Sequence, residues 1–172
     1  MHQMGNLLGH LASEQRVFAR KKLELRKEVE DLLPEALSKI DAEGRRFICE
    51  VVTFNYTIGK STCVTTSSDD DGNIVFAKRP WDDGLTRFVK NREPELSNKM
   101  YIILKKMDDK RDYILIKATI GDAMEPEIWD EKSFDLSEVP GIARSKSNEF
   151  WSSHAIVWDS EKIAPESVVI VE

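Results

Sequence analysis

A single histidine near the end of the chain lies in an aromatic frame, the stretch FWSSHAIVWD at residues 150–159. His2 and His10 are at the extreme N-terminus, so His154 is the histidine expected inside the folded body. Histidine titrates near neutral pH and therefore suits acid or base catalysis. A histidine between Trp151 and Trp158 also fits a neutral core residue whose ring nitrogens are hydrogen-bonded. From the sequence, both interpretations of His154 stay open.

A second group of reactive side chains lies in the stretch FAKRPWDDGLTRFVKNREP at residues 76–94. It brings together basic residues in an otherwise acidic chain: Lys78, Arg79, Arg87, Lys90 and Arg92. Guanidinium and ammonium groups at this density fit the recognition of an anion such as phosphate.

Strand periodicity predicts which of these side chains share a face. If LTRFVKN is a strand, Thr86, Phe88 and Lys90 lie on one face of a sheet. The same alternation in YILIKATI groups three more side chains: Tyr113, Lys117 and Thr119. One sheet face would then carry hydroxyl and ammonium groups. The alternative is a solvated face on which lysines protect an edge strand.

These residue types fit the cleavage of RNA without a metal ion. That reaction needs a base for the 2′-hydroxyl proton, an acid for the leaving 5′-oxygen, and donors that hold the charge of the phosphorane. The candidate catalytic residues are His154, Arg87 and Thr86. The candidate substrate-binding residues are Lys78, Lys90, Lys117, Thr119 and Trp151.

Other motifs in the chain lack a part that their chemistry requires. IGKST ends like a phosphate-binding loop, but Phe54 stands where that loop needs its first glycine. The DDDG turn resembles the start of a calcium loop, but Lys78 stands where the closing glutamate belongs. Two cysteines, Cys49 and Cys63, cannot form a four-ligand metal cage. We therefore expect no metal, no cofactor and reduced cysteines.

Composition limits the class of protein. The chain has 172 residues, 41% hydrophobic and 33% charged, which fits a soluble globular protein long enough to bury a core. No apolar run approaches the length of a membrane span, and the start lacks the pattern of a secretion signal, so we expect a cytoplasmic protein without a membrane partner. The net charge of −6 disfavours coating of nucleic acid by bulk electrostatics, although a local basic site remains compatible with it.

Apolar spacing predicts helices at the N-terminus. The pattern from Leu11 to Ile40 has a helical period, interrupted by Pro34 and followed by Gly44. It predicts a long helix, a break near Leu33 and a short second helix. A basic outer face on this helix fits a solvated surface or a binding site for nucleic acid or a protein partner. Its apolar stripe is expected to pack against the sheet or against another copy of the chain.

After Arg46 the period changes to that of strands. YIILKK and DYILIKATIG, joined by MDDKRD, predict a hairpin, and a short helix is expected to begin at a Ser147 cap. Helices followed by consecutive strands predict an α+β fold with a mostly antiparallel sheet. We expect an N-terminal helical segment at residues 1–44 and an α+β domain at residues 45–172.

The segments DGLTRFVKN, YIILKK, YILIKATIG, PEIWD and FWSSHAIVWD together resemble a group of small uncharacterised bacterial and phage-associated proteins. Over roughly residues 57–159 the arrangement is similar to the superfamily of barnase, colicin-type tRNases and RelE-like nucleases. The resemblance implies a toxin-like, metal-independent endoribonuclease that uses His154 as acid or base. The alternative is a non-catalytic phage or host-interaction protein of the same fold, in which Trp81, Trp129 and the basic strand form the binding surface.

Overall fold

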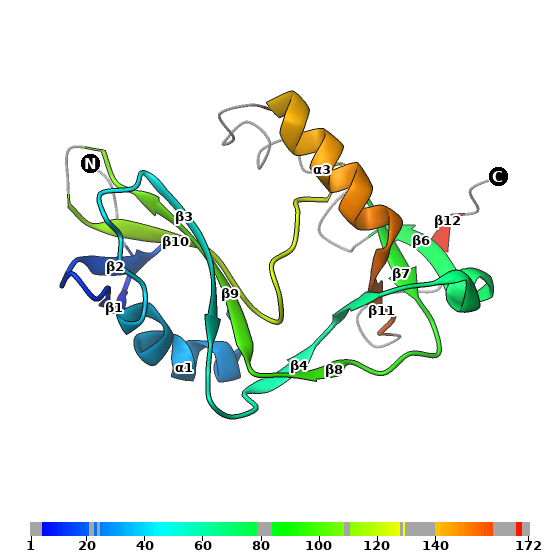
Figure 1. Cartoon of the computed structure of the whole chain (residues 1–172), viewed down its shortest axis with the longest axis horizontal. Coiled ribbons are helices and arrows are strands. Elements are labelled where there is room, and N and C mark those ends of the chain that lie inside the picture. Colours follow the sequence, from blue (N-terminus) through cyan, green and yellow to red (C-terminus); the bar gives the residue numbers. More distant parts are fainter. Residues whose placement is uncertain are drawn as a thin grey trace. The chain divides into compact units, whose positions relative to one another are not determined.

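The computed structural model describes residues 5–20, 23, 25–78, 84–108, 111–127, 129, 140–159 and 168–169 (Figure 1). The chain folds into two compact units. The first unit contains residues Met1–Ser61 and Leu96–Ala123, and the second contains Thr62–Glu95 and Met124–Glu172. The expected boundary between residues 44 and 45 differs from this division, because residues 1–44 belong to the first unit together with the strands that follow them.

A five-stranded sheet forms the body of the first unit. Its strand order is β1 (Leu7–His10), β2 (Arg16–Ala19), β10 (Tyr113–Ile120), β9 (Lys99–Lys106) and β3 (Phe47–Thr53). All neighbouring strands are antiparallel except β2 and β10, which are parallel. The expected hairpin is confirmed, since β9 and β10 pair directly from Tyr113 opposite Lys106 to Ile120 opposite Met100.

One helix, α1 (Lys27–Ser38), packs against this sheet and buries an apolar stripe. The buried residues of the stripe are Val29, Leu33, Ala36 and Leu37, which have helical spacing. They join Ile48, Ile102 and Leu104 of the sheet in one core cluster. Pro34 lies inside the helix, so the expected break and second helix are absent from residues 27–38.

The N-terminal helix predicted from Leu11 onward is wrong. Residues 7–19 form the β1–β2 hairpin, whose turn is closed by a hydrogen bond from the Leu11 N–H to the Gln15 carbonyl at 2.8 Å. Glu14 adopts a left-handed backbone with φ of 66°, which no helix contains. The parallel pairing of β2 with β10 and the ion pair between Arg16 and Asp112 at 2.7 Å hold this segment extended. Tertiary contacts thus override the local helical spacing.

A second five-stranded sheet forms the body of the second unit. Its order is β12 (Val168–Val169), β6 (Ile74–Lys78), β7 (Leu85–Val89), β11 (His154–Val157) and β5 (Cys63–Thr65). The strands are antiparallel except for the parallel pair β7 and β11. The short strands β4 (Gly59–Ser61) and β8 (Glu95–Ser97) form a separate two-stranded sheet.

Among the described residues, the helices of the second unit are α3 (Pro140–Ser152) and the 3-10 helix η1 (Ser68–Asn73). Ser147 was expected to cap a helix, but it lies inside α3 and its side chain is completely buried. The structure confirms the α+β class with mostly antiparallel sheets, although its first helix begins only at Lys27. Over the described ranges, every helix is too short or too polar to cross a bilayer.

Asp70 anchors the start of η1. Its carboxylate accepts the Ser67 N–H at 3.0 Å and the Arg92 Nη1 at 3.2 Å, while the Ser67 hydroxyl accepts the Asp69 N–H at 3.3 Å. The hydrogen bond from Ser67 lowers the pKa of Asp70; burial opposes this shift and Arg92 adds to it.

We predict that Asp70→Asn lowers the stability of the fold in a pH-dependent way. A depressed pKa in the folded state means that the ionised group stabilises the protein above its unfolded pKa of about 4. That stability is lost as the pH falls through the lower, folded-state pKa. Urea unfolding from pH 7 to pH 2 should therefore show a constant difference between wild type and variant near neutrality that shrinks below about pH 4. A pH-independent difference would contradict this role of the charge.

Candidate functional site

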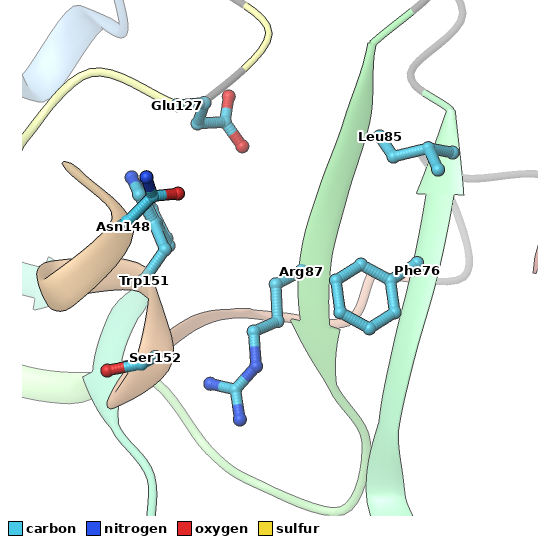
Figure 2. A pocket seen from close by; sticks show the side chains of 7 residues that line it. All are labelled: Phe76, Leu85, Arg87, Glu127, Asn148, Trp151 and Ser152. Atoms are coloured by element: carbon cyan, nitrogen blue, oxygen red, sulfur yellow. The ribbon is translucent and has the colours of Figure 1, made fainter. Parts of the chain in front are cut away.

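A pocket of about 300 Å³ lies in the second unit, between one face of its sheet and α3 (Figure 2). Its lining residues are Phe76, Leu85, Arg87, Glu127, Asn148, Trp151 and Ser152. The volume is at the lower end of the range of small-molecule sites. Figure 2 shows the Arg87 guanidinium and the Glu127 carboxylate at opposite ends of this space.

Strand alternation and helix spacing bring the lining residues together. Phe76 on β6 lies directly opposite Arg87 on β7, and Leu85 is two residues before Arg87, so all three side chains point to the same face. From α3, positions 148, 151 and 152 are spaced by three and four residues and therefore share one side of the helix.

Arg87 is the cation of the pocket. Its Nη1 donates to the Thr66 Oγ1 and to the His154 carbonyl, both at 2.8 Å. Burial lowers the pKa of Arg87, and the charges of Asp71 and Asp70 oppose that shift. Within the described residues, no carboxylate lies within ion-pair distance of this guanidinium. A half-buried arginine with only neutral partners retains the capacity to bind an anion.

Trp151 forms a fixed aromatic wall of the pocket. Only 7% of its surface is exposed, and its Nε1–H is shared between the carbonyls of Glu125 at 3.1 Å and Pro126 at 3.2 Å. The ring of Phe150 packs edge-on against it, with ring centres 5.0 Å apart. Hydrogen bonding of the indole and packing of its ring together set the orientation of this surface.

His154 lies beside the pocket and is absent from the residues that line it. Its ring stacks on Phe150 with centres 3.9 Å apart and planes at 6°, and the side chain is half-buried. The Nδ1 atom is 2.9 Å from the Phe150 carbonyl and 3.1 Å from the Ser153 hydroxyl. Since a carbonyl can only accept, the contact with Phe150 favours the Nδ1–H tautomer, in which Nε2 is the basic nitrogen.

Thr86, Lys78 and Lys90 are absent from the residues that line the pocket. Thr86 is completely buried on the opposite face of β7 from Arg87, and its Oγ1 has no hydrogen-bond partner in the described structure. Lys78 is exposed at the end of β6. Lys90 shares the face of Phe88, as expected, and its Nζ lies 5.0 Å from the ring centre of Trp158. This lysine is held by a cation–π contact.

Lys117 and Thr119 belong to the first unit, whereas His154 and Arg87 belong to the second. The expectation that Tyr113 shares their face is wrong. A bulge between Leu115 and Lys117 shifts the register of β10, so Tyr113 is buried in the core while Lys117 and Thr119 point to the other side of the sheet. The Tyr113 hydroxyl donates to the Arg45 carbonyl at 2.6 Å, and burial raises its pKa.

Sequence reasoning found Arg87 and Trp151 but missed the other lining residues. The sequence does carry a signal for Asn148 and Ser152. Asn148 is three residues before Trp151 and four before Ser152, so a helix over this segment, such as α3, places the three on one side. Glu127 lies in the loop after β10, where the sequence has no periodic pattern that would have identified it.

The aromatic binding surface considered above is only partly described. Trp129 packs against Gly84, where a Cβ would come within 2.0 Å of the indole ring. Trp81 and Arg79 lie outside the described residues. Cys49 and Cys63 are not joined in a disulfide, and the described part of the chain contains no cluster of three or more histidine, cysteine or acidic side chains that could hold a metal ion.

Comparison with known proteins gives a likeness of fold. No family model and no curated protein matches the chain. Among solved structures, it is similar to the 2.35 Å crystal structure of a conserved hypothetical protein from Toxoplasma gondii ME49. The TM-score is 0.50 at 13% identity, with 78% of this chain and 86% of that chain covered.

We predict that Thr86→Val stabilises the protein by about 1 kcal/mol, because a buried hydroxyl without a partner costs desolvation energy that a methyl group of similar size does not. For a chain of this length the melting temperature should rise by about 2–4 °C. Thr53→Val, at an exposed position on β3, is the matched control and should shift it less. A lower melting temperature for Thr86→Val would show that the hydroxyl is satisfied in solution.

Proposed function

We propose that this chain is a binding protein whose second unit holds a small ligand with an anionic group at Arg87. The observation that carries the proposal is the half-buried guanidinium in the pocket wall, which among the described residues bonds the neutral oxygens of Thr66 and His154 and has no carboxylate within ion-pair distance. The charges of Asp71 and Asp70 act on it from beyond that distance. Burying a charge without a direct ion-pair partner is costly, so such a group fits a site whose anion arrives with the ligand.

The rest of the pocket limits the body of the ligand. Trp151 and Phe76 supply aromatic walls, and Leu85 adds an aliphatic one, which together favour a flat or apolar body. At the far end from Arg87, the Glu127 carboxylate favours a group that donates hydrogen bonds (Figure 2). A nucleotide has these features in this order: a phosphate, a flat base and, for most bases, an amino group.

A metal-independent ribonuclease is the second candidate, favoured by the environment of His154. The Nδ1–H of the His154 ring is directed to the Phe150 carbonyl, which leaves Nε2 as a base. Arg87 donates a hydrogen bond to the backbone carbonyl of His154. The position of His154 outside the pocket lining makes this candidate secondary to binding. In this proposal, Arg87 would stabilise the charge of the phosphorane.

We predict that Arg87→Gln weakens binding of nucleotides by about tenfold or more, because charge-assisted hydrogen bonds contribute roughly 1.5–3 kcal/mol. Calorimetric titration with the four ribonucleoside 5′-monophosphates and with inorganic phosphate measures this change. Lys27→Gln, an exposed residue of α1 that makes the same change in charge, should have no effect. Arg87→Lys retains the charge without the fork geometry and should be intermediate.

Two results would contradict the proposed site. One is the absence of binding for every nucleotide by the wild-type protein. The other is equal affinity in the wild-type protein and in a folded Arg87→Gln variant.

Ribonuclease activity is tested separately with His154→Asn, whose amide can still donate to the Phe150 carbonyl but cannot take up a proton. As a binding protein, the wild-type chain should leave a labelled single-stranded RNA intact, with or without EDTA. Cleavage that persists in EDTA and is lost in His154→Asn would instead establish the second candidate. The melting temperature of the variant controls for loss of folding.

A further inference from the structure

The strand β3 lies at one end of the five-stranded sheet of the first unit. Within the described ranges it pairs with β9 alone, from Phe47 opposite Lys105 to Thr53 opposite Lys99, and the register does not shift along the strand. On its other side, the described part of the chain supplies no neighbouring strand. A long and regular edge of this kind is a template for a further strand.

The backbone groups of β3 alternate between β9 and this edge. Just before the strand, the Lys106 N–H donates to the Arg46 carbonyl at 2.8 Å, and just after it the Phe54 N–H donates to the Asn98 carbonyl at 2.8 Å. In an antiparallel ladder, the residues that exchange hydrogen bonds with one neighbour occur at every second position. The even-numbered residues from 46 to 54 therefore bond β9. The backbone groups directed to the edge are those of Phe47, Cys49, Val51 and Thr53.

Solvent reaches this edge at its middle and at its end. Val51 is 36% exposed and Thr53 is exposed as well, whereas Ile48 and Val52 on the core face are 0% and 6% exposed. Phe47 at the start of the strand is half-buried. The edge residues are uncharged, and β3 contains no lysine or proline, the residues that commonly protect an edge strand from pairing.

The opposite edge strand, β1, has the protection that β3 lacks. It is four residues long, and its register against β2 shifts between Leu7 and Gly9. Gly9 also lies so close to α1 that a Cβ at this position would be 3.3 Å from the Pro34 Cα and from the Leu37 Cδ1. A short, irregular strand held against a helix is a poor template for pairing. The two edges of the sheet are therefore not equivalent.

We propose that β3 pairs antiparallel with β3 of a second copy of this chain, so that two five-stranded sheets are joined across a two-fold axis. A two-fold interface is self-complementary, and the same edge N–H and C=O groups serve as donors and acceptors in both copies. A second copy also presents uncharged side chains of matching size to Val51 and Thr53. The edge offers no charge by which a charged peptide of another protein would be selected.

Glu50 limits the register of this pairing. An axis at Glu50 would place the two Glu50 side chains directly opposite each other, and like charges at opposed positions are unfavourable. An axis one residue away, at Val51 or at Cys49, places Glu50 opposite Val52 or Ile48 instead. Within each copy Glu50 keeps its ion pair with Arg45. Both of these registers use the N–H and C=O groups of Val51, so this residue is the position at which the pairing is tested.

The size of the contact limits its strength. One strand from each copy buries less than the roughly 1,600 Å² of a standard interface, so we expect a dissociation constant on the order of 10–100 µM. The pairing is independent of the pocket at Arg87, because β3 belongs to the first unit and Arg87 to the second. Arg87→Gln should therefore leave the dimer unchanged, and failure of the nucleotide titrations would not remove it.

Sedimentation equilibrium of the full chain, from about 5 to about 500 µM, measures the dimer. A reducing buffer prevents a disulfide between Cys49 residues from producing a dimer by another route. We expect Val51→Pro to raise the dissociation constant about tenfold or more, because proline removes the N–H at the edge without removing a hydrogen bond to β9. Val51→Lys should have the same effect by placing a charge on the edge.

The matched control is Leu7→Lys, which makes the same change in charge at a 50% exposed apolar residue of β1 and should leave the dimer intact. Melting temperatures show whether each variant is folded, and Val51→Lys serves for the comparison if Val51→Pro is not. A wild-type chain that stays monomeric at every concentration would overturn the proposal. Equal dimerisation of the wild type and both folded Val51 variants, or equal weakening by Leu7→Lys, would overturn the assignment to β3.

Discussion

In the second unit, one half-buried cation joins three strands or their ends. Arg87 extends from β7 and, through a single nitrogen, bonds both the carbonyl of His154 at the start of β11 and the hydroxyl of Thr66 just after β5. It thereby links segments that lie 67 and 21 residues away in the sequence. A lysine ammonium could also donate to two acceptors from one nitrogen, but only the planar guanidinium keeps its other N–H groups fixed in orientation and available to a ligand. The geometry of the pocket wall follows from that constraint.

The first unit depends instead on a shift of register. Without the bulge between Leu115 and Lys117, the alternation of β10 that buries Leu115 would also bury Lys117 and Thr119 and would expose Ala118 and Ile120. The bulge lets both halves of the strand contribute to the core, since Leu115 and Ile120 are both buried. It also places Lys117 beside Ile103 and brings a second cation close to the row that contains Lys105. One extra residue therefore keeps the core continuous along β10 while Lys117 and Thr119 lie on the opposite face of the sheet.

Local signals predicted the parts of the fold that form locally. The β9–β10 hairpin and the strands around Val75 and Phe88 have alternating side chains and adjacent turns, so their pairing needs no distant partner. The prediction of a helix in the N-terminal segment was wrong for the opposite reason. Its strand β2 is held by β10 and by Asp112, which is 96 residues from Arg16, and no window of the sequence contains that contact. A smaller part of the pocket was predicted: Arg87 and Trp151 stand out by residue type, whereas Glu127 is positioned only by the tertiary fold.

The acidic balance of the chain and its basic sites are compatible because the charges are segregated. Several carboxylates are tied to cations inside the fold, as Asp70 is to Arg92 and Asp112 to Arg16, so their fields are largely neutralised at short range. Exposed acidic groups elsewhere are screened within about 8–10 Å at physiological salt. A ligand at Arg87 therefore responds to the nearest cations more than to the net charge of −6. The net charge lowers the rate of encounter with a polyanion, while the local arrangement of cations and rings determines whether the encounter leads to binding.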